Sequence, residues 1–160
     1  MTRLNRYLAL DWGERRIGLA VSDPSGTIAS PAGHILRRAG KRPPIAEVIR
    51  RAEALEAQGF VAGLPLDESG AETVRSREVR AVGITLHART GLPVVLVDER
   101  YTTAIALRAV RELGGKTKDR AGDVDSLAAT VLLQHALRLA ERGAANGPDG
   151  QPGTTPDDEG

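Results

Sequence analysis

Two short apolar runs near the start of the chain flank a charged turn, and this pattern predicts a β-hairpin. The first run spans residues 7–10 and the second spans 17–22. Short apolar runs that are bounded by glycine and charged residues are typical of buried strands. Gly13 lies near the start of the short connection and favours a tight turn. The chain is therefore expected to open with two antiparallel strands.

The order of the later elements extends this hairpin into a mixed sheet. A third strand is predicted over 27–36, where Pro31 suits an edge position because proline cannot donate to a central ladder. After it, helical and strand patterns alternate. In chain order we expect a helix opened by Pro43-Pro44 and ended by Gly59, a strand over 60–66, a helix over about 71–90, a strand over 93–99, a helix capped by Thr102 or Thr103, and a last helix that starts at 123–126.

Two of these helices carry further expectations. Val74 is expected to face inward from the helix over 71–90, and Gly91 is expected to cap its C-terminal end in a left-handed conformation. Val110 is expected on the inner face of the helix that follows Thr103.

Strands that are separated by helices are usually parallel, with right-handed crossovers. The predicted fold class is therefore α/β, with a five-stranded mixed sheet and helices on both faces. The first three strands form an antiparallel meander, and the later two join in parallel beside the first.

Composition limits both the core and the chemistry. The 160 residues suffice for one domain, and the scarcity of aromatic residues means that Val, Leu, Ile and Ala must build its core. The absence of cysteine excludes disulfides, thiolate metal sites and cysteine nucleophiles. The sequence has neither a membrane-spanning run nor the apolar stretch of a signal peptide, so the expected location is the cytoplasm, without membrane contact.

The net charge of +1 is unevenly distributed. Residues 143–160 carry four acidic and no basic side chains, so residues 1–142 have a net charge of +5. The tail is also rich in Gly and Pro, and we expect it to be disordered beyond a folded domain that spans residues 1–142. A mildly basic domain permits a polyanionic partner without requiring one.

Acidic residues follow two of the predicted strands, namely Asp11 and the pair Asp98-Glu99. Ligands in such sheets bind at the carboxyl ends of the strands, so these acids are candidates for one site. Glu99 is preferred over Asp98 because its side chain reaches further. Asp125, in the first turn of the last helix, is a third candidate, whereas Asp123 is better explained as a helix cap. Each acid also has the simpler interpretation of a solvated turn or capping residue.

If these acids converge, they can hold Mg²⁺ or Mn²⁺, which prefer oxygen ligands. Two ions about 3.5–4 Å apart, bridged by Asp11, would activate a water molecule and stabilise the leaving oxygen of a phosphodiester. No competing site is apparent in the sequence. His34, His87 and His135 are scattered, no Ser-His-Asp arrangement has supporting context, and no Walker lysine motif is present.

Basic side chains are expected near the acidic end of the sheet, where they could bind a nucleic-acid backbone. Ordinary surface charge explains any one of them equally well. In loop 114–122 the basic residues and glycines suit a clamp on nucleic acid, and Tyr101 could stack on a base, although packing is the favoured role for it. The basic candidates are Arg15, Arg16, Arg100, Lys116, Lys118 and Arg120.

Four short motifs occur along the chain in a fixed order. They are Asp11-x-Gly13-x-x-Arg16-Ile17-Gly18-x-Ala20-x-Ser22-Asp23, Gly63-Leu64-Pro65-Leu66, Asp98-Glu99-Arg100-Tyr101-Thr102-Thr103 and Val124-Asp125-Ser126-x-Ala128-Ala129.

In this combination, which covers about residues 4–140, the sequence resembles the YqgF/RuvX family. The resemblance implies an RNase H-like fold and a divalent-metal nuclease that matures the 5′ end of pre-16S ribosomal RNA or resolves Holliday junctions. It also implies that Asp11, Glu99 (less surely Asp98) and Asp125 are the catalytic acids. Two features depart from the family pattern. Asp67 stands where Asn often follows the Gly-Leu-Pro-Leu motif, and the acidic tail is unlike the family core.

Two other functions compete with the nuclease. A non-catalytic RNA-binding factor in ribosome assembly could keep the same fold. An ATP-binding protein of the actin and sugar-kinase class also begins with Asp-x-Gly before a second strand, but that class needs two such domains around a cleft. The sequence leaves open whether the substrate is precursor rRNA or branched DNA, and whether the protein is a monomer or a homodimer. Junction resolution would need two active sites and hence a dimer.

Overall fold

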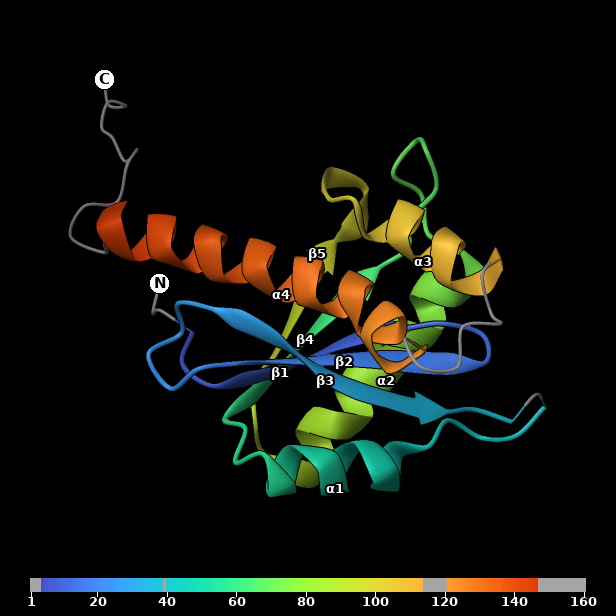
Figure 1. Ribbon diagram of the computed structural model, residues 1–160, viewed down its shortest axis with the longest axis horizontal. Helices are drawn as coiled ribbons and strands as arrows, with labels where there is room; N and C mark the ends of the chain where they lie inside the picture. Colours follow the sequence, from blue (N-terminus) through green and yellow to red (C-terminus); the bar gives the residue numbers. More distant parts are fainter. Residues whose placement is uncertain (1–3, 39, 114–120, 147–160) are drawn as a thin grey trace.

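The computed structural model describes residues 4–38, 40–113 and 121–146, with side chains described for 4–38, 40–110 and 126–143. Its centre is one five-stranded sheet in the order β3-β2-β1-β4-β5 (Figure 1). β1 pairs antiparallel with β2, and β2 with β3, whereas β1 pairs in parallel with β4, and β4 with β5. This arrangement confirms the predicted fold class. The strands are β1 (Tyr7–Trp12), β2 (Arg16–Ser22), β3 (Ala29–Leu36), β4 (Gly59–Leu64) and β5 (Val94–Asp98).

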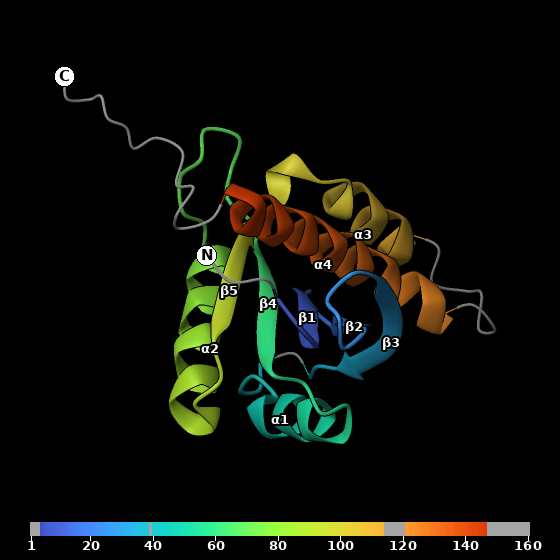
Figure 2. The same ribbon diagram turned by 90° about the vertical axis from the view of Figure 1, so that its left-hand side faces the viewer.

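Helices cover both faces of the sheet (Figure 2). On one face lie α1 (Ile45–Ala54) and α2 (Val74–Thr90). The long helix α4 (Ala121–Asn146) crosses the other face, and α3 (Ala104–Leu113) packs against α4. A short 3₁₀ turn, η1 (Glu99–Tyr101), connects β5 to α3. Among the described helices, none is long and apolar enough to cross a membrane.

Successive residues of each strand point to opposite faces, and this alternation divides the core in two. On β1, Leu8, Leu10 and Trp12 pack toward α1 and α2, whereas Ala9 packs toward α4. Asp11 follows Ala9 at the two-residue spacing of a strand and therefore lies on the α4 face. The fold thus positions a buried carboxylate at the carboxyl end of a central strand.

Glycines lie beside Asp11 on the neighbouring strands. Asp11 pairs with Gly18 of β2, which pairs in turn with His34 of β3. On the other side, Leu10 pairs with Ala62, so Gly63 of β4 lies next to Asp11. Because cross-strand neighbours point to the same face, this row leaves space around the carboxylate.

The predicted third strand is confirmed as an edge strand that contains Pro31, and its pairing with β2 is irregular between Gly18 and Ala20. Gly33 in this region has a φ of 89°, a left-handed conformation that favours glycine. Its backbone N–H donates to Ser126 Oγ at 3.1 Å, and Ser126 Oγ donates to its carbonyl oxygen at 2.8 Å. These two hydrogen bonds anchor the start of α4 on the sheet.

Several details differ from the sequence-based expectations. α2 begins at Val74 instead of near residue 71, because Thr73 caps it by accepting a hydrogen bond from the backbone N–H of Ser76. Val74 was expected to face inward but is 83 % exposed, since it is the first residue after the cap. Val110 is likewise exposed instead of packed. The cap of α2 at Gly91, in a left-handed conformation, is as predicted.

The last helix continues beyond Gly143 to Asn146. Residues 147–160, which form most of the predicted tail, lie outside the described residues. The division into a domain over 1–142 and a disordered tail therefore stays a prediction.

Candidate active site

Asp11 and Glu99, far apart in the sequence, are joined in the structure by one arginine, Arg108 of α3. Its Nε donates to Asp11 Oδ1 at 2.8 Å and its Nη1 donates to Glu99 Oε2 at 3.1 Å. Its Nη2 donates both to Glu99 Oε1, at 2.7 Å, and to Asp11 Oδ1. A single nitrogen atom therefore contacts both carboxylates.

This group of three charged side chains is removed from solvent. Asp11 is 0 % exposed, Glu99 is 2 % exposed and the side chain of Arg108 is 16 % exposed. Two buried carboxylates repel each other and lose their hydration, so they need a compensating positive charge. Burial alone would lower the pKa of Arg108, but hydrogen bonds to Glu99 and the charge of Asp11 outweigh it and raise that pKa above its usual range.

The alternation of β5 explains why Glu99 joins the site. Val95 and Val97 pack on the α4 face of the sheet, and Glu99 follows them at the same spacing. A Cβ on Gly63 would lie 3.2 Å from Glu99 Oε1 and 2.8 Å from Leu132 Cδ1. The glycine of the Gly-Leu-Pro-Leu motif therefore makes room for the Glu99 carboxylate beneath α4.

Asp98 points elsewhere and serves a different local purpose. Its carboxylate accepts hydrogen bonds from the backbone N–H of Arg100 at 3.0 Å and from Arg100 Nη2 at 2.7 Å. The side-chain hydrogen bond from Arg100 is the main reason that the pKa of Asp98 is lowered. Arg100 Nη1 also donates to the carbonyl oxygen of Glu68, at 3.2 Å. Asp98 and Arg100 thus fix the turn after β5 to the loop after β4, and Glu99 is the acid that meets Asp11.

The other sequence-predicted residues are placed as follows. Arg15 is exposed at the tip of the β1–β2 hairpin, and Arg16 is half-buried at the start of β2. Tyr101, for which packing was favoured, is instead 72 % exposed, with the Arg100 guanidinium 5.5 Å from its ring. The basic residues Lys116, Lys118 and Arg120 lie outside the described residues.

Asp125 belongs to the first turns of α4, but its side chain is not among those described. The neighbouring Ser126 is fully buried and is held on Gly33 of β3, one residue before His34 in the row that contains Asp11. The backbone at Asp125 therefore lies on the same face of the sheet as the two buried carboxylates. Its membership in their group stays a prediction.

Arg108 was not anticipated from the sequence. The signal was nevertheless present, because Arg108 follows Leu107 and lies four residues after the buried Ala104, on the inner side of α3. An arginine in the apolar stripe of a short helix needs a buried anionic partner. The acids at the strand ends were the available partners.

The donor set is compatible with a hard divalent cation. Asp11 and Glu99 supply only oxygen atoms, and the bridging nitrogen of Arg108 shows that a positive charge is stable within contact of both. Among the described residues, no group of three or more His, Cys, Asp or Glu side chains could hold a metal ion. A complete metal site would therefore need at least one further ligand, for which Asp125 is the candidate.

A sheet of this order with acids at its carboxyl edge defines an RNase H-like α/β domain. The structure is similar to that of the Thermus thermophilus protein described as "T. thermophilus RuvC in complex with Holliday junction substrate", with a TM-score of 0.51 and 15 % sequence identity. The match covers 86 % of this chain and 96 % of that chain. At this identity the likeness establishes the shared fold.

The family follows from the sequence comparisons. The family described as "RuvX: Holliday junction resolvase" matches residues 5–139, and the chain belongs to this family. Two relatives carry the name "Putative pre-16S rRNA nuclease". The one from Clavibacter michiganensis is 37 % identical over 91 % of this chain and 90 % of its own length. The one from Koribacter versatilis is 42 % identical over 82 % of this chain and 86 % of its own length.

Proposed function

We propose that this protein is a divalent-metal-dependent endonuclease that hydrolyses phosphodiester bonds in structured nucleic acid. The observation that supports this most strongly is the pair of buried carboxylates, Asp11 and Glu99, that share one cationic group at the carboxyl edge of the sheet. The names of the relatives favour precursor 16S rRNA as the substrate, and the description of the family favours branched DNA.

In this proposal Asp11, Glu99 and Asp125 hold Mg²⁺ or Mn²⁺. When bound, such an ion lowers the pKa of a coordinated water molecule and stabilises the leaving oxygen of the phosphodiester. The protein contributes the negative charge of the carboxylates, and their burial beneath α4, next to apolar side chains such as Leu132, strengthens the attraction to a cation. Arg108 supplies the positive charge between the carboxylates in the absence of a cation, and its guanidinium can donate to a phosphate oxygen once it leaves them.

The carboxylates are tested by the conservative variants Asp11→Asn and Glu99→Gln. Each keeps the shape of the side chain but removes its charge, so we expect metal-dependent cleavage to fall by about 10³-fold or more, comparable to the loss of a strong electrostatic contribution. Glu53→Gln, at an exposed position on α1, is the matched control and should cleave like the wild type. Circular dichroism should show that all three variants keep the fold. Cleavage at the wild-type rate by Asp11→Asn would contradict the proposal.

A second function is favoured by Arg108 itself. Because this arginine donates to both carboxylates, it offsets part of their negative charge without a metal ion. The protein could then act as a non-catalytic RNA-binding factor in ribosome assembly. In that case binding would persist without divalent metal, and no strand scission would appear during a titration with Mn²⁺.

The class of nucleic acid is tested by offering precursor rRNA and a synthetic four-way junction side by side, while the oligomeric state is measured. Cleavage of the RNA by a monomer supports rRNA processing. Symmetric cleavage of the junction by a homodimer supports resolution, because two opposed strands must be cut by two sites.

A further inference from the structure

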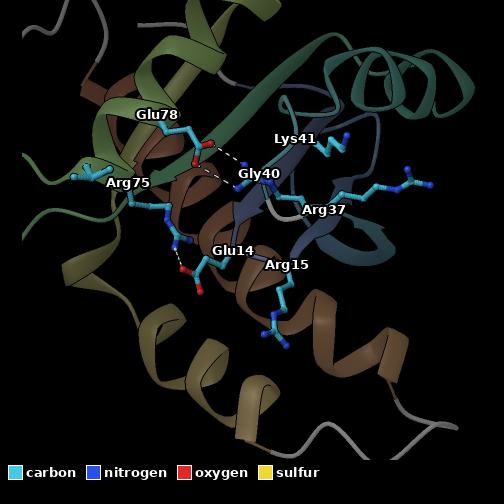
Figure 3. Close-up of a pocket in the computed structure, with 9 residues that line it drawn as sticks. Glu14, Arg15, Arg37, Gly40, Lys41, Arg75 and Glu78 are labelled. Atoms are coloured by element: carbon cyan, nitrogen blue, oxygen red, sulfur yellow. Dashed lines mark hydrogen bonds and ion pairs between the residues drawn. The ribbon is translucent and has the colours of Figure 1, made fainter.

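A second polar site lies on the other side of the β1–β2 hairpin from the carboxylates. It is a pocket of about 490 Å³ between the hairpin tip, the segment that follows β3 and the first turns of α2 (Figure 3). Five of its lining side chains are basic and two are acidic. The lining residues are Glu14, Arg15, Arg37, Arg38, Gly40, Lys41, Val74, Arg75 and Glu78.

One wall of this pocket is formed by Arg37 and Glu78, which contact each other and Trp12. The guanidinium of Arg37 lies 5.1 Å from the centre of the indole ring, and its side chain is only 10 % exposed. Arg37 donates to both carboxylate oxygens of Glu78, at 2.7 and 3.3 Å, and to the carbonyl oxygen of Gly13 at 2.7 Å. Trp12 Nε1 also donates to Glu78 Oε1, at 3.1 Å. Arg37 and Glu78 are therefore structural, and their charges compensate each other.

The remaining basic side chains are only weakly compensated. Arg75 and Glu14 approach to 3.8 Å, and the Glu14 side chain is 79 % exposed, so this ion pair contributes little. Arg15, Arg38 and Lys41 are exposed, and within the described part of the chain none of these three side chains forms an ion pair. The backbone N–H of Arg37 donates to the carbonyl oxygen of Arg15 at 2.7 Å, which holds the two segments that carry these cations together.

The pocket and the carboxylates are neighbours along β1. Asp11 points to the α4 face. The next residue, Trp12, points to the opposite face, where its indole ring lies against the guanidinium of Arg37. Gly13, Glu14 and Arg15 then form the hairpin tip between the two sites. Both sites therefore lie at the same end of β1, on opposite faces of the sheet.

We propose that this basic pocket is a separate binding site for the phosphodiester backbone of a polynucleotide. Guanidinium and ammonium groups bind phosphate strongly, and three of them here have no anionic partner among the side chains that the structure describes. None of the described lining residues is aromatic, and Trp12 is covered at 3 % exposure, so the pocket cannot stack bases. It contacts phosphates and is therefore tolerant of sequence.

This inference rests on the proposed function for the identity of the ligand as nucleic acid, but it does not depend on catalysis. A strand held in the pocket crosses the hairpin tip and reaches Asp11 and Glu99. The pocket thus orients the substrate without taking part in hydrolysis. Of the two carboxylates that line the pocket, Glu78 is paired with Arg37 and Glu14 lies nearest to Arg75, so phosphate binding by Arg15, Arg38 and Lys41 does not require a divalent metal.

The test is a metal-free binding titration of the full-length chain with fluorescently labelled single-stranded RNA and with a four-way DNA junction, in EDTA. The variant replaces Arg15, Arg38 and Lys41 by Ala. Its control, with the same change in net charge, replaces the exposed residues Arg50, Arg89 and Arg142 by Ala. Losing three phosphate contacts should weaken binding about tenfold or more at low salt and reduce the slope of log K against log salt by roughly 2–3.

The control variant should bind like the wild type. An equal loss in both triple variants would overturn the proposal, since net charge alone would then explain the binding. If the pocket variant bound normally, the proposal would also fail. The single change Lys41→Glu, compared with Arg50→Glu, repeats the test with a smaller disturbance of the fold, and the same pattern is expected.

Two further measurements separate this proposal from related ones. If millimolar inorganic phosphate displaces the RNA as well as an unlabelled oligonucleotide does, the pocket is a site for free phosphate and the proposal is overturned. Asp11→Asn should bind in EDTA like the wild type, even though its cleavage is expected to be lost. Failure of the nuclease proposal would therefore show in the cleavage of Asp11→Asn, and failure of the pocket proposal in the binding of the triple variant.

Discussion

At the scale of single residues, the buried contact of Arg108 with Asp11 and Glu99 has the largest energetic consequences. A buried ion pair contributes little net stability, because desolvation offsets the attraction between the charges. Removing one partner is costly, because the remaining charges stay buried. Arg108 therefore stabilises the carboxylates in the metal-free protein, and its position between them makes it a competitor for any cation that binds there.

Replacing Arg108 by Ala should expose this competition. Without its guanidinium, the two carboxylates repel each other, and we expect a loss of roughly 3–5 kcal/mol of unfolding free energy. For a chain of this size that corresponds to a decrease in Tm on the order of 10 °C. Because a bound cation stabilises the folded state by mass action, Mn²⁺ should raise the Tm of this variant more than that of the wild type.

Thermal unfolding with and without Mn²⁺ measures both effects. The matched control is Arg138→Ala, which removes an exposed arginine from α4. An Arg108→Ala protein with the wild-type Tm, and with the same response to Mn²⁺, would show that the guanidinium neither stabilises the carboxylates nor competes with a cation.

At the scale of secondary-structure elements, the position of α4 matters most. This helix crosses the sheet and brings residue 125 toward the acidic edge, and the described contact that fixes its start is the pair of hydrogen bonds between Ser126 and Gly33. Ser126, which makes both of these hydrogen bonds, is fully buried. Any shift of this contact would move the third candidate acid relative to Asp11 and Glu99.

Replacing Ser126 by Ala should therefore weaken both the fold and the proposed site. The backbone N–H of Gly33 loses its acceptor, and we expect a cost of about 1–3 kcal/mol in unfolding free energy, measured by urea denaturation. Metal-dependent cleavage, measured well below the Tm, should also decrease. Ser30→Ala, at an exposed position of the same strand, should change neither quantity. If Ser126→Ala has the stability of the wild type, the anchoring role of this contact is refuted.

The helices and strands also show how much of the fold could be predicted from the sequence. The strand order followed from short apolar runs and from the connections between them, because these features are local and the chirality of the crossovers is fixed. Pro31 and Gly91 were placed correctly because each residue has one dominant backbone preference. Val74 was misjudged because the cap at Thr73 shifted the start of α2.

The site was harder to predict because its members meet only in three dimensions. The choice between Asp98 and Glu99 depends on which face of β5 each side chain follows, and a strand buried on both faces gives no such signal. Arg108 lies within an apolar stripe, so its partners become visible only when α3 is packed against the sheet. The role of Asp125 is still a prediction for the same reason.

At the scale of the whole molecule, two polar sites share one end of the sheet. The carboxylates lie on the α4 face, and the basic pocket lies across the hairpin on the face covered by α1 and α2. The net charge of +5 over residues 1–142 supports association with a polyanion in general. The positions of the two sites also suggest a path for a bound strand, because its backbone would run from the basic pocket to Asp11 and Glu99.

The central claim is that Asp11 and Glu99 form one cation site, and calorimetric titration with Mn²⁺ tests it most directly. The wild type and Glu53→Gln are predicted to bind Mn²⁺ alike. Asp11→Asn and Glu99→Gln are each predicted to bind it about tenfold more weakly or worse, since even the loss of a partner of a metal ligand has that effect. Unchanged Mn²⁺ binding in both variants, or a loss in only one of them, would contradict a site that the two carboxylates share.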